Sequence, residues 1–103
     1  MSVPQFTTPT FTLTFTEQGL DLTTAENVYV TFKSKMNVIT KTGDSLTVAA
    51  RSIIVHLTQM ETGKFCPGDI EIQANWTTAS GDRAASKIVA YHIDRQLLTE
   101  VIA

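Results

Sequence analysis

The sequence predicts an all-β protein, an immunoglobulin-like sandwich of two sheets with about seven strands and one or two short helical turns. The first observation is the stretch TFTLTFT at residues 10–16, where Phe and Leu alternate with Thr, as in a strand with one buried face. The second is that short apolar runs recur about every 8–12 residues, with turn residues between them. The third is an excess of threonine, 17 residues in 103, because β-branched side chains favour extended backbone. A small barrel is the alternative architecture.

The chain of 103 residues corresponds to one small domain. We expect residues 1–9 to form an N-terminal arm, either loose or lying on a neighbour, because Pro4 and Pro9 each remove a backbone donor. Residues 10–103 are expected to form a single β-sandwich domain. Cys66 is the only cysteine, so the chain lacks the paired core cysteines of antibody domains.

Seven extended segments follow one another along the chain. In the segment with the only Trp, Trp76 shares one face with Ile70 and Ile72, which predicts a core strand. The last segment is apolar on both faces, a pattern typical of strands that are covered on both sides. Two segments in the middle of the chain, 45–50 and 52–58, are either two strands or one strand with a break. The expected segments are residues 10–16, 27–35, 36–41, 45–50, 52–58, 70–76 and 85–94.

Two T-x-x-E patterns are candidates for the start of a helical turn. The first, at Thr23–Glu26, is either one helical turn or an ordinary polar connection. The second, at Thr58–Glu61, follows a strand, and we expect one helical turn there that crosses from one sheet to the other. Ser80-Gly81-Asp82 predicts a tight hairpin before the final strand.

The C-terminal residues place four large aliphatic side chains at the spacing of a short helical face. Such a group at a chain end either folds back on the domain or meets another subunit. We therefore assign these residues, together with one aromatic in the arm, to a candidate partner interface: Phe6, Leu97, Leu98, Val101 and Ile102.

The sequence contains no pattern that predicts an enzyme. A metal site needs about three or four convergent ligands, and His56 and His92 lie on different strands without an H-x-H partner. Cys66 is interpreted as a small buried side chain. No catalytic, cofactor-binding or metal-binding residue and no small-molecule substrate is therefore predicted. Trp76 is expected in the core; exposed Tyr29 and Tyr91 would instead permit stacking on a sugar.

Charge disfavours a nucleic-acid partner. The net charge is −2, and the eight basic residues are spread along the chain, whereas phosphate neutralisation usually needs clustered Lys and Arg. No apolar run approaches the ~18–20 residues of a membrane span, and the N-terminus has no signal-peptide pattern, so we expect a cytoplasmic product and no membrane partner. Charged residues make up 17%, which leaves neutral polar surface that a subunit can bury without stranding ions.

The span from Thr10 to Ile102 resembles a family of small structural proteins of tailed phages and prophages of Gram-positive gut bacteria. The resemblance is carried by a threonine-rich first strand and by the patterns D-L-T, V-Y-V-T-F, L-T-Q-x-E-T-x-x-F, G-x-I-x-I-Q-x-N-W, G-x-R-x-A-S and Q-L-L-x-x-V-I. In this chain they are Asp21–Thr23, Val28–Phe32, Leu57–Phe65, Gly68–Trp76, Gly81–Ser86 and Gln96–Ile102.

This resemblance implies a β-sandwich similar to the N-terminal domain of baseplate upper proteins and a place in the virion. The expected function is non-enzymatic: protein–protein assembly in the virion, in the tail or baseplate, with copies of itself or with other virion proteins. The alternative is a β-sandwich module that binds a carbohydrate or a host surface, because a fold does not fix a function.

Overall fold

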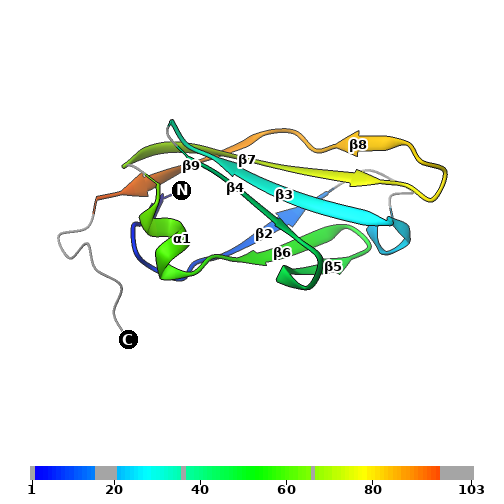
Figure 1. Ribbon diagram of the computed structural model, residues 1–103, viewed down its shortest axis with the longest axis horizontal. Coiled ribbons are helices and arrows are strands. Elements are labelled where there is room, and N and C mark those ends of the chain that lie inside the picture. Colours follow the sequence, from blue (N-terminus) through cyan, green and yellow to red (C-terminus); the bar gives the residue numbers. More distant parts are fainter. Residues whose placement is uncertain (1, 16–20, 36, 66, 96–103) are drawn as a thin grey trace.

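The computed structural model describes residues 2–15, 21–35, 37–65 and 67–95, and every structural statement below concerns these residues. Two β-sheets pack face to face, and short helices connect or cap the strands (Figure 1). The prediction of an all-β, two-sheet sandwich is confirmed. Nine strands are described, two more than expected, and both additions have a physical cause given below.

The larger sheet is built around its longest strand, β7, which pairs with β3 along seven residues. All its pairings are antiparallel except the one between β1 and β9. β8 pairs with one half of β7 and β9 with the other half. In sheet order the strands are β1 (Ser2–Pro4), β9 (Val89–Asp94), β7 (Gly68–Thr77), β3 (Asn27–Lys33) and β4 (Val38–Thr42), with β8 (Arg83–Ala85) beside β7.

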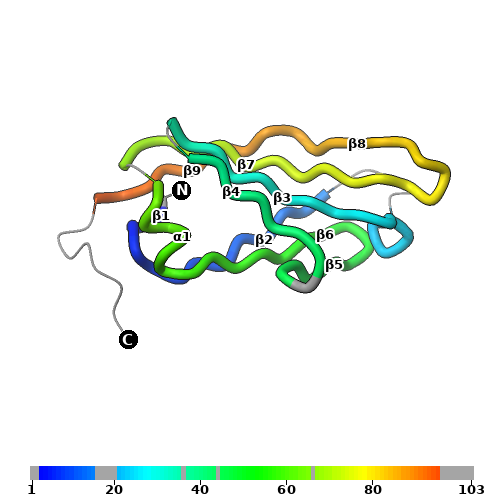
Figure 2. Tube along the Cα trace, in the orientation of Figure 1, coloured from blue at the N-terminus to red at the C-terminus, as the bar shows by residue number. Residues whose placement is uncertain are grey.

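The smaller sheet has the order β2-β6-β5 and is antiparallel throughout. Its strands are β2 (Thr10–Thr14), β6 (Ser52–His56) and β5 (Leu46–Ala49), so the open question about residues 45–58 is answered by two strands. In immunoglobulin terms β2, β6 and β5 correspond to strands B, E and D, and β4, β3, β7 and β9 to strands C′, C, F and G. The tube in Figure 2 shows the two layers lying along each other.

Alternating side chains from both sheets form the core. Phe11 of the smaller sheet packs against Phe32 and Tyr91 of the larger, with ring centroids 5.4 and 5.0 Å apart. Trp76 is 6% exposed and meets Phe15 edge-on, so its expected core position is confirmed. The fully buried side chains include Val30, Phe32, Ile53, Val55, Leu57, Phe65, Ile70, Ile72 and Ile93.

Three short helices lie in the described part of the chain and connect its strands. The helix α1 (Gln59–Gly63) links β6 to β7, and therefore crosses between the sheets as expected; Thr58 and Glu61 form its capping box. The 3-10 helix η1 (Leu22–Thr24) is capped by Asp21, so the first T-x-x-E pattern makes no capping box. A second 3-10 helix, η2, spans Gly43–Ser45. Of the two alternatives for the first pattern, the segment therefore contains a short helical turn, although this turn begins before Thr23 and does not include Glu26.

The N-terminal residues differ from the expected arm. Ser2–Pro4 form β1, which pairs in parallel with β9 of the same chain, and Val3 is buried in the core. Gln5 continues the contact, because its Nε2 donates to the carbonyl oxygen of Phe65 at 2.7 Å. Pro4 has no backbone N–H to donate, and it is tolerated because β1 is an edge strand, which has a hydrogen-bonding neighbour on one side only.

The expected return strand 85–94 is divided by a β-bulge. Ala85 lies opposite Asn75 and Val89 lies opposite Ile72, so residues 86–88 face only the two residues between them on β7. The extra residue reverses which side chains point inward: Ala84 faces the core before the bulge, and Val89, Tyr91 and Ile93 do so after it. The prediction of a strand covered on both faces is wrong, because Ile88 is 56% exposed.

Candidate interaction surface

One edge of the sandwich is open, between β2 and the strand formed by β8 and β9. In a constant-type immunoglobulin sandwich, strand A joins the sheet that contains B. Here the first strand, β1, pairs with β9 instead, so β2 is the last strand of its sheet. No backbone hydrogen bond in the described residues reaches the outer edge of β2.

The register identifies the backbone groups on that edge. Phe15 donates its N–H to the carbonyl of Arg51 at 2.8 Å, and the carbonyl of Pro9 accepts from Leu57 at 3.1 Å. In an antiparallel ladder, alternate residues exchange these bonds with their partner, so the odd-numbered residues of β2 face β6. The N–H and C=O groups of the even-numbered residues therefore point away from the sheet: Thr10, Thr12 and Thr14.

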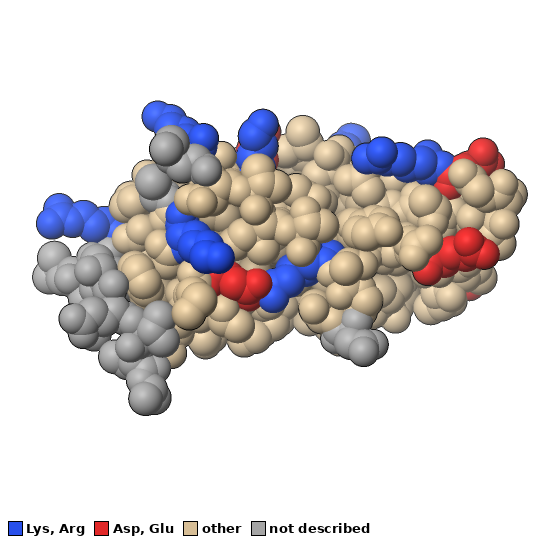
Figure 3. All heavy atoms as spheres, viewed as in Figure 1, with Lys and Arg blue, Asp and Glu red and all other residues tan. Residues whose placement is uncertain are grey.

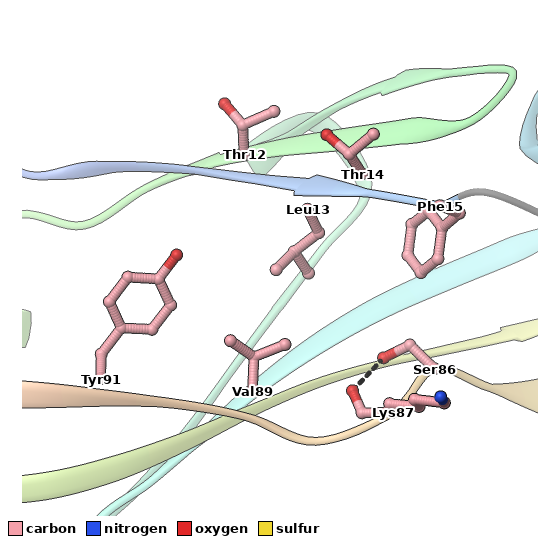
Figure 4. A pocket seen from close by; sticks show the side chains of 8 residues that line it. All are labelled: Thr12, Leu13, Thr14, Phe15, Ser86, Lys87, Val89 and Tyr91. Carbon is pink, nitrogen blue, oxygen red and sulfur yellow. Dashed lines mark hydrogen bonds between the residues drawn. The ribbon is translucent and has the colours of Figure 1, made fainter. Parts of the chain in front are cut away.

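A groove of about 530 Å³ opens beside this edge. Figure 4 shows Leu13, Val89 and Tyr91 projecting into the space between the two layers, whereas Thr12 and Thr14 project away from it. Apolar side chains therefore face the space between the sheets, and polar residues such as Ser86 and Lys87 also line the groove. Its lining is Thr12, Leu13, Thr14, Phe15, Ser86, Lys87, Val89 and Tyr91.

The bulge forms one wall of the groove and is held by Ser86. The backbone N–H of Ala74 donates to Ser86 Oγ at 2.9 Å, while the N–H of Ser86 donates to the carbonyl of Ala74 at 2.8 Å. Gln73 Nε2 donates to the carbonyl of Ser86 at 2.9 Å. At the bulge the hydroxyl of Ser86, in place of a backbone carbonyl, accepts the N–H of Ala74 on β7.

A second, smaller hollow of about 280 Å³ lies around Tyr29 on the outer face of the larger sheet. Tyr29 is 38% exposed, and Arg83 Nη2 donates to Asn75 Oδ1 at 3.3 Å beside it. The remaining lining residues are Thr31, Thr40, Trp76 and Thr77. This hollow combines one aromatic face with neutral and cationic hydrogen-bonding groups.

The structure places one of the five predicted interface residues. Phe6 is half-buried and lies against α1, because a Cβ added to Gly63 would overlap its ring. Phe6 therefore has a packing role within the chain. The other predicted residues, Leu97, Leu98, Val101 and Ile102, lie outside the described residues, as does Cys66.

Both histidines have partners on neighbouring strands. His56 Nδ1 lies 3.0 Å from Thr10 Oγ1, and His92 Nδ1 lies 3.2 Å from Asp69 Oδ1. Each contact joins residues that are directly opposite in the register, which the sequence alone does not indicate. Within the described ranges, no three His, Cys, Asp or Glu side chains are grouped so that they could hold a metal ion.

Charged side chains do not gather on the visible face. Figure 3 shows mostly uncharged surface, with Lys and Arg scattered over it. None of the helices in the described part of the chain is long and apolar enough to cross a membrane.

No family model matches the chain, and no curated protein matches its sequence.

Proposed function

We propose that this protein is a non-enzymatic structural protein of a tailed phage or prophage, which assembles with copies of itself or with other virion proteins in the tail or baseplate. The open edge at β2 is the observation that carries this proposal. It offers backbone hydrogen-bonding groups beside a groove that contains apolar side chains such as Leu13 and Val89, the combination by which one chain adds to the sheet of another.

The sequence resemblance supports the same proposal. Two of its patterns, V-Y-V-T-F and G-x-I-x-I-Q-x-N-W, lie in β3 and β7, which are neighbours in the larger sheet. Their buried members, such as Phe32 and Ile72, belong to the core. The buried members of these two patterns thus help to build the sandwich, which is the fold that the resemblance implies.

The test is the composition of phage particles. We expect mass spectrometry of purified particles, from a lysate of the strain that carries the gene, to detect this protein in a fixed ratio to the tail proteins. Immunogold labelling of those particles then locates it on the tail or baseplate. Absence from the particles, together with a monomer in sedimentation experiments, contradicts the proposal.

We also propose that Leu97, Leu98, Val101 and Ile102 contact the partner. A chain ending at Arg95 is expected to keep its melting temperature and to lose assembly. A lower melting temperature instead assigns this segment to the domain's own core. For Phe6, the variant Phe6→Ala is made in the full-length chain. A lower melting temperature with unchanged assembly indicates a packing role, and lost assembly with an unchanged melting temperature indicates a partner contact.

The second candidate function is binding of a carbohydrate or a host surface, favoured by the hollow at Tyr29. An exposed aromatic ring beside Asn75 and Arg83 offers stacking and hydrogen bonds in one place. Glycan-array binding that is lost in Tyr29→Ala supports this function. Tyr91→Ala tests the groove in the same way, although Tyr91 also packs on Phe11.

A further inference from the structure

The outer edges of the two sheets differ in their protection against pairing with another strand. Natural proteins protect such edges with charged residues, including ones that point inward, with proline, with bulges, with short strands or with a covering segment. On β4, Lys41 points inward and its Nζ contacts Glu61 Oε2 at 2.6 Å. β1 has three residues and ends in Pro4, and β8 has three residues, contains Arg83 and runs into the bulge.

The smaller sheet has one protected and one unprotected edge. η1 covers part of the β5 edge, because the N–H of Leu22 donates to the carbonyl of Ala50 at 2.9 Å. β2 has none of these devices: its residues, TFTLT, include no charge, no proline and no bulge, and they pair with β6 without interruption. Among the described strands, β2 is therefore the longest outer strand without protection.

We propose that β2 pairs antiparallel with β2 of a second copy of this chain, around a two-fold axis at Thr12. This proposal specifies how copies assemble within the function proposed above. The outward backbone groups belong to Thr10, Thr12 and Thr14, so a centre at Thr12 places Thr12 opposite its own copy and Thr10 opposite Thr14. Every one of these opposite pairs exchanges two hydrogen bonds, because all of them are of the bonded type.

A second copy fits this edge better than a charged partner does. The strand carries no charged residue, so self-pairing brings no like charges together. Thr side chains then lie opposite Thr side chains on the outer face, a favourable cross-strand pair. The pairing joins the two small sheets into one continuous sheet, and the two-fold relation closes the assembly, because each copy uses the one unprotected edge among its described strands.

The groove adds buried apolar side chains to the backbone hydrogen bonds of the pairing. Val89 is 41% exposed on the groove wall, and Tyr91 is half-buried there. A strand added to β2 lies across the mouth of the groove and covers these side chains from the solvent. Because the paired segment is short, the buried area is smaller than in obligate dimers, and we expect a weak, concentration-dependent dimer.

Charge substitutions at Thr12 test the pairing in the full chain. Thr12 is exposed, so Thr12→Lys leaves the monomer folded but places two like charges opposite each other at the two-fold axis. We expect sedimentation equilibrium to show dimers of the wild type and about tenfold or more weaker association of both Thr12→Lys and Thr12→Glu. A mixture of the two variants is expected to recover the dimer as a heterodimer.

The matched control is Thr40→Lys on β4. Thr40 is exposed, and its N–H also points outward. The carbonyl of Asn37 accepts the N–H of Ser34 at 2.9 Å, so the odd-numbered residues of β4 form the bonded pairs with β3 and the even-numbered Thr40 does not. This variant is expected to dimerise like the wild type. Equal losses in both variants overturn the proposal, and so does a dimer that Thr12→Lys leaves unchanged.

Amide hydrogen exchange gives a second readout that does not depend on substitution. In the monomer the amides of Leu13 and Phe15 are bonded to β6 or the residue before it, and those of Thr12 and Thr14 have no backbone acceptor among the described residues. We expect exchange at Thr12 and Thr14 to slow as the protein concentration rises. Unchanged exchange at these two amides overturns the pairing, as does a chain that stays monomeric at all concentrations. Detection of the protein in phage particles then still supports the virion function, so the two proposals fail separately.

Discussion

The ammonium nitrogen of Lys41 lies 2.6 Å from Oε2 of Glu61, and this ion pair ties the outer strand β4 to the helix α1. Glu61 also accepts the backbone N–H of Thr58 at 2.9 Å as part of the capping box. Partial burial raises the pKa of Glu61, but the hydrogen bonds from Lys41 and Thr58 and the charge of Lys41 outweigh it. The pKa is therefore lower in the folded chain than its ordinary value.

The first prediction concerns acid stability. A lowered pKa in the folded state means that ionised Glu61 stabilises the fold above the ordinary Glu pKa of about 4.3, and that this stabilisation is lost as pH falls through the folded value. Glu61→Gln removes the charge and keeps a residue that can complete the capping box. We expect the variant to lose less stability than the wild type on acidification, measured by urea denaturation at a series of pH values. If the free energy of unfolding of the wild type and of Glu61→Gln falls in parallel with pH, Glu61 does not have a lowered pKa in the folded chain.

The second prediction concerns the contact of Phe6 with Gly63. A Gly→Ala change in a helix usually stabilises it by up to about 1 kcal/mol, but here the new methyl group overlaps the Phe6 ring. We expect Gly63→Ala to lower the free energy of unfolding by about 1–3 kcal/mol, as for other overpacked sites. In a Phe6→Ala background, Gly63→Ala is expected to become neutral or stabilising. A double-mutant cycle measures this coupling, and additive effects rule it out.

The third prediction concerns Trp76. It is 6% exposed and contacts Phe15 with ring centroids 5.6 Å apart. We expect Trp76→Ala to cost about 3–5 kcal/mol in chemical denaturation, since it removes a large core side chain. Tyr29→Ala, on the exposed face of the neighbouring strand, is the control and is expected to cost much less. Similar costs for the two variants contradict the assignment of Trp76 to the core.

The fourth prediction concerns the hydroxyl of Ser86. It accepts the backbone N–H of Ala74, and Ala74 is fully buried. Ser86→Ala leaves that N–H without its acceptor, which is expected to cost about 1–3 kcal/mol of stability and to speed amide exchange at Ala74. Ser86→Thr keeps a hydroxyl on Cβ and is the matched control. If exchange at Ala74 is unchanged in Ser86→Ala, another group satisfies this N–H.

The sequence predicts those parts of the fold that depend on local patterns. Phe11 and Leu13 alternate with threonine and form β2, and Thr58 with Glu61 predicts the capping box of α1. Each signal spans only a few residues. Its physical cause, the period of a strand or the unsatisfied donors of a helix end, also acts over a few residues.

Features that join distant segments were not predictable in this way. The pairing of Ser2–Pro4 with β9 involves three residues and a partner at the other end of the chain, so it leaves no periodic pattern. The bond between His92 and Asp69 depends on strand register, which the sequence does not state. The candidate site was missed for a related reason: alternation shows which face of β2 is buried, but does not show whether its edge has a partner.

The bulge at residues 86–88 makes this segment one residue longer than its register on β7 requires. Deleting one of these three residues would leave two residues opposite Gln73 and Ala74, so β8 and β9 would join into one strand with Val89, Tyr91 and Ile93 still facing the interior. A single-codon deletion therefore removes the bulge while keeping the core contacts, which substitution scanning cannot do.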